Sequence, residues 1–186
     1  MSILSTILNF FGTKSQRDMK ELSPSLNKTL SLGSELVSLS NDDLRKKTIA
    51  FKTQISDSIQ GVEGTIQNLK KEIELEKNPD LQEKLYSQID DLSAEKEEAI
   101  INVLDLIKEE AFAVIKETAK RFTENKQIIV TANEKDEFFS QKSDYINIEK
   151  NQAIWNTSWM SGGVMKKWDM IHYDVQLVGG LVLHQG

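Results

Sequence analysis

The residues best suited to recognise a ligand lie in the segment 170–186, which reads MIHYDVQLVGGLVLHQG. Gln176 carries an amide that both donates and accepts hydrogen bonds, and it follows the imidazole of His172 and the phenol ring of Tyr173. Together these side chains could contact the edge and the face of a flat heterocycle. The paired glycines that follow allow another backbone to approach closely, but they suit a tightly packed core helix or an edge strand equally well.

No other residues of the chain are arranged for catalysis. Carboxylates stand side by side at 90–91, 97–98 and 109–110, but adjacent side chains on a helix diverge and cannot act on one substrate. The 186 residues include no cysteine, which excludes disulfides and thiolate metal sites. They also lack the phosphate-binding pattern G-x-x-x-x-G-K-[ST]. We therefore predict no catalytic residue and no metal site in this chain.

Three blocks stand upstream of HYDVQLVGGLVLHQG, in the order MSILSTILNFFGTKSQRDMKEL, LSNDDLRKKTIAFK and EEAFAVIKETAKRF. Together the four blocks resemble, in the same order, the SecA family, the motor ATPases of the bacterial Sec preprotein translocase. HYDVQLVGGLVLHQG is similar to the family's Q-motif region, whose pattern is Met-Arg-His-Phe-Asp-Val-Gln-Leu-x-Gly-Gly-Met-x-Leu. In the family, the chain continues from the Q motif into a phosphate-binding loop. The resemblance therefore implies an amino-terminal fragment that leads into an α/β RecA-like motor domain which it does not contain.

The resemblance implies that ATP is the cofactor, as Mg-ATP in the full-length protein. Gln176 matches the glutamine that reads adenine, and Met170 and Tyr173 match residues that would pack on the base. Ile171 departs from the pattern, since the family usually has arginine there. Because phosphoryl transfer needs a phosphate cradle, a lysine and a magnesium-binding carboxylate, we expect this fragment to have no ATPase activity alone.

The resemblance also implies a function for the whole motor, which would be an ATP-dependent translocase that pushes secretory preproteins through the Sec channel. Its partners would be the channel, the preproteins, anionic membrane lipid and, in a homodimer, a second copy. Its location would be cytoplasmic and peripheral on the cytoplasmic face of the inner membrane. The net charge of −6 argues against dedicated nucleic-acid binding. The alternative is an autonomous helical coiled-coil adaptor that never binds nucleotide.

The segment 1–12 is predicted to be an amphipathic helix. Its large apolar residues recur at helical spacing and form one stripe, and basic residues follow the stripe closely. The stripe consists of Ile3, Leu4, Ile7, Leu8 and Phe11, followed by Lys14, Arg17 and Lys20. From the residues alone, this stripe could lie on an anionic membrane or pack on its own domain. The resemblance favours contact with lipid and the channel.

Helices are predicted for most of the chain, so we expect a mainly α fold. Residues 15–54 would form helices of the first nucleotide-binding domain, with a kink or a new start near Ser23 because Pro24 follows. Ser40 is predicted to cap the next helix. Apolar residues at steps of four and three, from Ile55 to Ile73 and from Leu81 to Leu106, then indicate an antiparallel helical hairpin, 55–109, which the family pattern lacks. Asn78 and Pro79 are expected to form the turn between its two arms. Residues 110–122 return to that pattern as a helix of the motor domain.

The segment 123–169 is predicted to be a second insertion, rich in β-strand and tryptophan. Two short strands are expected, at 127–131 and at 144–148, with a turn or loop at 133–136 between them. All three tryptophans of the chain follow, at 155, 159 and 168. They could anchor a small subdomain, stack on bases or grip an apolar segment. Residues 170–186 complete the chain as the adenine-binding segment.

Overall fold

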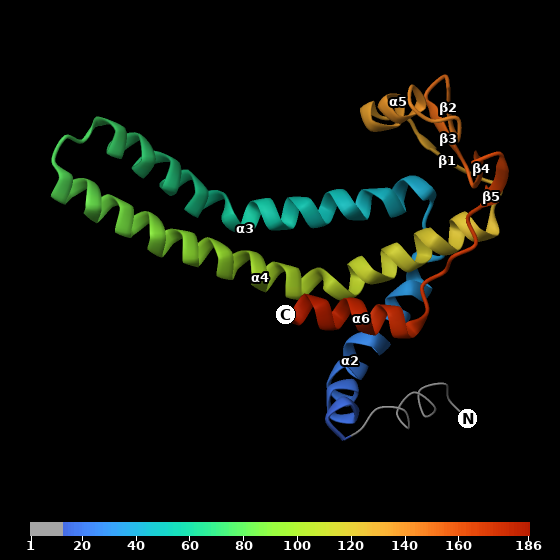
Figure 1. Ribbon diagram of the computed structural model, residues 1–186, viewed down its shortest axis with the longest axis horizontal. Helices are drawn as coiled ribbons and strands as arrows, with labels where there is room; N and C mark the ends of the chain where they lie inside the picture. Colours follow the sequence, from blue (N-terminus) through green and yellow to red (C-terminus); the bar gives the residue numbers. More distant parts are fainter. Residues whose placement is uncertain (1–12) are drawn as a thin grey trace. The chain divides into compact units, whose positions relative to one another are not determined.

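The computed structural model describes the backbone of residues 13–186 and the side chains of residues 19–186. The amphipathic helix predicted for 1–12 lies outside the described residues. In the described part the chain is mainly α-helical with small antiparallel sheets, which confirms the predicted fold class (Figure 1). The chain divides into two compact units. The first is made of the residues up to Lys47 and from Glu109 onward, and the second is Thr48–Lys108.

Helix α2, Thr13–Leu36, runs through Pro24 without interruption, so the predicted new start near Ser23 is wrong. The Ser23 hydroxyl does not cap a new turn. It donates to the carbonyl of Met19 at 2.6 Å, within the same helix. A proline inside a helix costs about 3 kcal/mol, whereas burying two leucines contributes roughly 3 to 6 kcal/mol. Leu22 and Leu26 are both buried on this helix, which explains why it continues.

Helix α3, Asn41–Leu75, begins where the sequence predicts. The Oγ of Ser40 accepts a hydrogen bond from the backbone N–H of Asp43 at 3.1 Å, which is the expected N-terminal cap. Helix α4, Pro79–Glu124, starts after a short turn. In that turn the Asn78 side chain accepts a hydrogen bond from the N–H of Asp80 at 3.0 Å. The turn expected at Asn78 and Pro79 is therefore also confirmed.

The second unit is the predicted antiparallel hairpin, formed by most of α3 and the first part of α4 (Figure 1). Every predicted seam position of α3 is buried or half-buried, and the positions are Ile55, Ile59, Val62, Ile66, Leu69 and Ile73. An ion pair between Glu63 and Lys96, 2.9 Å long, joins the two arms. On α4, however, Leu81 and Leu106 are 42% and 76% exposed. The expectation that they face the seam is wrong, and Ile107 is buried instead.

The β structure of the first unit is larger than predicted. One sheet has the order β1-β3-β2 and is antiparallel throughout. Its strands are β1, Gln127–Thr131, β2, Ile146–Glu149, and β3, Gln152–Asn156. A separate hairpin pairs β4, Ser158–Ser161, with β5, Val164–Lys167. The two predicted strands are confirmed as β1 and β2, with β2 shifted by two residues at its start. The other three strands were not predicted.

The loop predicted at 133–136 is wrong, because helix α5, Glu134–Ser140, occupies this position. The Asn133 side chain accepts from the N–H groups of Lys135 and Asp136, at 3.0 and 3.1 Å. The carboxylate of Asp136 accepts from the N–H of Asn133 in return, at 3.1 Å. This reciprocal pair is a capping box, and it stabilises the first turn of a short helix.

A buried ion pair attaches the three-stranded sheet and α5 to the start of α3. Arg45 donates two hydrogen bonds of 2.8 Å each to the carboxylate of Asp136, which is only 1% exposed. The indole of Trp155 donates to the same carboxylate at 3.1 Å. Burial by itself would raise the pKa of Asp136, but the hydrogen bonds from Arg45 and Asn133 outweigh burial and hold this pKa below its usual value.

Candidate adenine-binding segment

The candidate segment ends in helix α6, Asp174–Gln185, which packs against α2. Leu177, Val178 and Leu181 are buried on one face of α6, where they form a core cluster with Leu22 and Leu26 of α2. These positions follow the three- and four-residue steps expected of a helix with one buried face. The helix therefore has a fixed attachment, and its other face remains open.

One of the two glycines of α6 lies at a close contact with α4. A Cβ atom built on Gly180 would lie 2.6 Å from Cε1 of Phe112 and 2.8 Å from its Cζ, both shorter than real carbon contacts. A Cβ atom on Gly179 would meet no atom of the described residues within 4 Å. The sequence left open whether these glycines admit another backbone, lie in a tightly packed helix or lie in an edge strand. Gly180 lies in a tightly packed helix.

The residues at the start of α6 and just before it are held by one neighbouring side chain and by two side chains of α4. The carbonyl of Met170 accepts from the indole N–H of Trp168 at 2.8 Å and from the hydroxyl of Thr123 at 3.3 Å. Lys116 of α4 forms an ion pair of 2.9 Å with Asp174, the first residue of α6. These contacts fix the path of the segment relative to α4.

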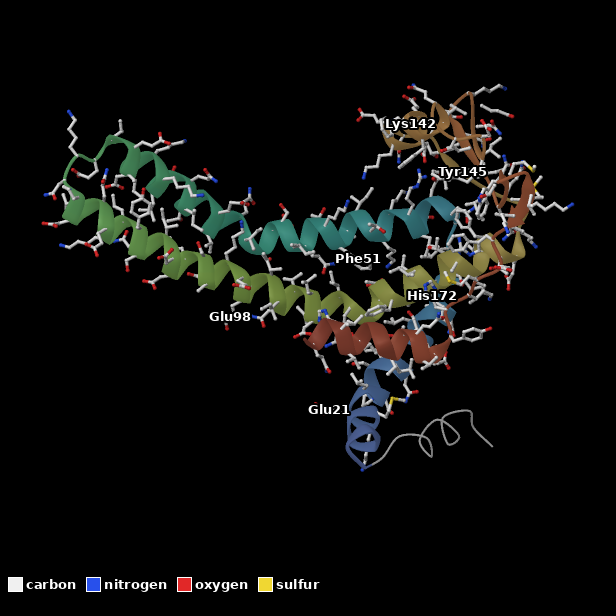
Figure 2. All side chains as sticks on the ribbon, viewed as in Figure 1. Glu21, Phe51, Glu98, Lys142, Tyr145 and His172 are labelled. Atoms are coloured by element: carbon white, nitrogen blue, oxygen red, sulfur yellow. The ribbon has the colours of Figure 1, made fainter. Side chains whose placement is uncertain are left out.

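His172 lies in the segment that leads into α6 (Figure 2). Its Nδ1 atom is buried and has no hydrogen-bond partner among the described residues. A buried polar atom without a partner is uncommon in folded proteins, and such atoms occur at sites that bind a ligand or water. This orphan atom is adjacent in sequence to Tyr173, one of the predicted ligand-contacting residues.

Two of the three predicted adenine-contacting residues are in direct contact with each other. The backbone N–H of Tyr173 donates to Oε1 of Gln176 at 2.8 Å, which is one half of a capping box at the start of α6. Both residues are exposed, Tyr173 to 74%. The Gln176 amide nitrogen has no acceptor in the described part of the chain, and Oε1 keeps a second lone pair. Met170 is 42% exposed and is held through its carbonyl.

Ile171, which stands where the SecA pattern has arginine, lines a small cavity of about 180 Å³. Two lysines of α4, Lys116 and Lys120, line the same cavity, as do residues of α2. The cationic groups near this part of the segment therefore come from α4 and not from position 171.

The sequence did not indicate Lys116, Thr123 or Trp168 as parts of this site. Lys116 and Thr123 lie on α4, 58 and 47 residues from the groups that they contact, so no local pattern relates them to this segment. Trp168 is only two residues from Met170, but its type alone did not indicate that its indole would bind the Met170 carbonyl. Among residues 19–186 the structure contains no group of three or more His, Asp or Glu side chains that could bind a metal ion. No helix in the described range is both long and apolar enough to cross a membrane.

Comparison with known proteins places these features in one family. Residues 7–186 match the family model described as the SecA DEAD-like domain. The protein translocase subunit SecA of Flavobacterium psychrophilum is 49% identical over the whole chain, and those of Christiangramia forsetii and Phocaeicola vulgatus are 43% and 44% identical over 100% and 95% of it. No solved structure matches significantly.

The alignment with the Flavobacterium protein covers the hairpin and the tryptophan-rich region as well as the four blocks. The chain spans only 16–17% of the length of these three relatives. Because the family model covers nearly every residue and identity extends over the entire chain, this chain belongs to the SecA family.

Proposed function

We propose that this chain is the amino-terminal part of an ATP-driven protein translocase motor, and that residues 170–186 provide the adenine-reading edge of its ATP site. The observation that carries this proposal is the HYDVQ sequence at the start of α6, in a chain of the SecA family. Its tyrosine and glutamine are exposed and hydrogen-bonded to each other at the start of a helix whose opposite face is anchored.

The residues present fit the base of a nucleotide. The free amide N–H of Gln176 can donate to a ring nitrogen of adenine, while its Oε1 can accept from the exocyclic amino group. Guanine has a carbonyl oxygen where adenine has its amino group, and this acceptor would face Oε1, which the Tyr173 N–H holds in place, without a donor between them. The ring of Tyr173 and the side chain of Met170 are exposed and can cover the face of the base. ATP, bound with magnesium, supplies the phosphoanhydride bond whose hydrolysis would drive the motor.

The test is the substitution Gln176→Ala in a longer chain that includes a phosphate-binding loop. We expect ATP affinity to fall by about 1 to 3 kcal/mol, the loss of one or two buried hydrogen bonds. Gln185→Ala, an exposed glutamine at the other end of α6, is the matched control and should leave affinity unchanged. Equal ATP affinity of the Gln176→Ala variant and the unmodified protein would contradict the assignment.

A second expectation concerns the 186 residues alone. They offer contacts to the base but no phosphate cradle, so ATP binding should be weak and hydrolysis absent. Calorimetry of this chain with Mg-ATP measures the affinity directly. Micromolar binding would mean that the site lies elsewhere or contains more than the adenine edge.

The wider assignments follow from family membership and are part of the same proposal. Residues 15–54 and 110–122 would belong to the nucleotide-binding motor domain, with 55–109 and 123–169 as insertions into it. The segment 1–12 would contact anionic lipid and the Sec channel on the cytoplasmic face of the inner membrane, and secretory preproteins would be the substrate. A homodimer is compatible with this arrangement.

The competing function, an autonomous coiled-coil adaptor, rests only on the helical hairpin. The three relatives compared above are all named as translocase subunits, and the alignment with the Flavobacterium protein includes the hairpin. No observation favours the adaptor over the motor, and we do not propose it.

A further inference from the structure

A cavity of about 430 Å³ lies in the first unit, beside the strands and the end of α4. Its lining is almost entirely aromatic and includes every tryptophan of the chain. The lining residues are Phe122, Tyr145, Trp155, Asn156, Trp159 and Trp168, all of them half-buried. Figure 2 labels Tyr145 in this region. A cavity of this size and composition is typical of a ligand site, and the proposed nucleotide contact does not use it.

The lining favours an uncharged aromatic group. Among the residues that the structure describes, no charged side chain lines the cavity, so the described lining lacks the cations that a phosphate or a carboxylate would need. The ring centroid of Tyr145 lies 6.1 Å from that of Trp155 and 6.3 Å from that of Trp159, in tilted arrangements. Aromatic groups prefer such offset or tilted contacts, and each pair adds to the energy of burial.

The polar groups of the lining are mostly in use already. The indole N–H groups of Trp155 and Trp168 donate to Asp136 and to the carbonyl of Met170. These bonds fix the two rings as walls. The indole N–H of Trp159, in contrast, has no acceptor in the described part of the chain and can donate to a bound group.

Next to the cavity, the β4–β5 hairpin offers an edge for an extended chain. Trp159 of β4 lies opposite Lys166 of β5, so the hairpin contributes a wall of the cavity directly. Within the described residues β5 pairs only with β4, and all four of its residues are exposed. Its other edge therefore presents backbone N–H and C=O groups to which an extended peptide can add as a strand.

The hairpin is also apolar near its turn, whereas the far end of β5 carries Lys166 and Lys167. Met160, Val164 and Met165 are 61%, 56% and 61% exposed. Methionine side chains are flexible and adapt to different apolar surfaces, which suits a site that accepts varied sequences. A free small molecule would use the cavity alone. The exposed strand edge and the methionines beside it favour a polypeptide.

We propose that this cavity is a binding site for an aromatic side chain of an extended polypeptide, whose backbone pairs with the free edge of β5 while its ring enters between Tyr145, Trp159 and Trp168. The site is independent of the adenine assignment and would exist even if that assignment failed.

The proposal is tested with capped seven-residue peptides of serine and threonine that carry one central phenylalanine. Binding of the fluorescently labelled peptide to the 186-residue chain is followed by anisotropy. We expect saturable binding that is at least tenfold weaker when alanine replaces the phenylalanine. It should also be at least tenfold weaker when alternate backbone nitrogens are methylated, because N-methyl groups cannot donate to β5. N-acetylphenylalanine amide should compete at least tenfold more weakly than the peptide.

Substitutions in the chain provide the second arm. Trp159→Ala should weaken peptide binding at least tenfold, while Phe138→Ala, an exposed aromatic residue that does not line the cavity, should not change it. Circular dichroism verifies folding, and Trp159→Leu replaces the alanine variant if that variant does not fold. If the phenylalanine and alanine peptides bind equally tightly, or if the Trp159 variant binds the peptide as tightly as the unmodified chain, the cavity does not bind the aromatic side chain. If the methylated peptide or N-acetylphenylalanine amide binds as tightly as the unmodified phenylalanine peptide, the ligand is not an extended polypeptide.

Discussion

Two adjacent glycines of α6 should respond differently to the same substitution. Gly179 and Gly180 both lie inside the helix, where replacing glycine by alanine contributes about 1 kcal/mol through helix propensity. The two positions differ only in their surroundings. A Cβ atom at 179 points into open space, whereas one at 180 would lie 2.6 Å from the ring of Phe112.

The close contact decides the sign of the effect at Gly180. The ring of Phe112 packs against the α2–α6 core cluster, so it cannot move without losing contacts there. Overpacking of this kind costs about 1 to 3 kcal/mol. Since the helix-propensity gain is the same at both positions, the two variants should differ by the overpacking cost. We expect Gly179→Ala to stabilise α6 and Gly180→Ala to be neutral or destabilising.

The assay is amide hydrogen exchange of peptides covering 174–185, which reports the local free energy of opening of α6. Phe112→Leu shortens the opposing side chain, and in that background Gly180→Ala should stabilise α6 as Gly179→Ala does. If Gly180→Ala increases protection in the unmodified chain as much as Gly179→Ala, then Phe112 does not constrain α6 and the reasoning fails.

Three further predictions concern the ion pair and the amino terminus. Arg45→Met should destabilise the three-stranded sheet by about 3 kcal/mol, because it leaves the buried carboxylate of Asp136 without its cation; urea unfolding followed by tryptophan fluorescence measures this. The pKa of Asp136 is lowered in the folded state, so the stability it contributes should be complete above about pH 4, the unfolded value, and should be lost as the pH falls through the folded pKa. The loss should be smaller in Asp136→Asn. Deletion of residues 2–11 should abolish binding to anionic vesicles in a sedimentation assay while helical content elsewhere is retained; full binding after the deletion would place the membrane contact elsewhere.

Features that depend on neighbouring residues could be predicted from the sequence. The cap at Ser40, the turn at Asn78 and the seam of α3 each require only residues a few positions apart, and all three are confirmed. Helix α5 was missed although its signal is local. Asn133 and Asp136 have the spacing of a capping box, but the polar run suggested a turn.

Other features were decided by residues far apart in the sequence. The continuity of α2 through Pro24 depends on burial against α6, more than 140 positions later. The strands β3, β4 and β5 form because they find antiparallel partners, and β propensity alone does not reveal pairing. The partner of Arg45, 91 positions away, could not be read from any spacing.

The candidate site divides in the same way. The residue types at 170, 173 and 176, with the family pattern around them, were sufficient to identify the candidate adenine contacts, because recognition of a base depends on the donors and acceptors that a side chain carries. Only the tertiary structure decided how these residues are held. Trp168, Thr123 and Lys116 fix the approach to α6, and Phe112 selects glycine at 180 but not at 179. Apart from the bond of Trp168 to Met170, which spans only two residues, these contacts join segments that meet only after the chain has folded, so their identity is a property of packing and not of local sequence.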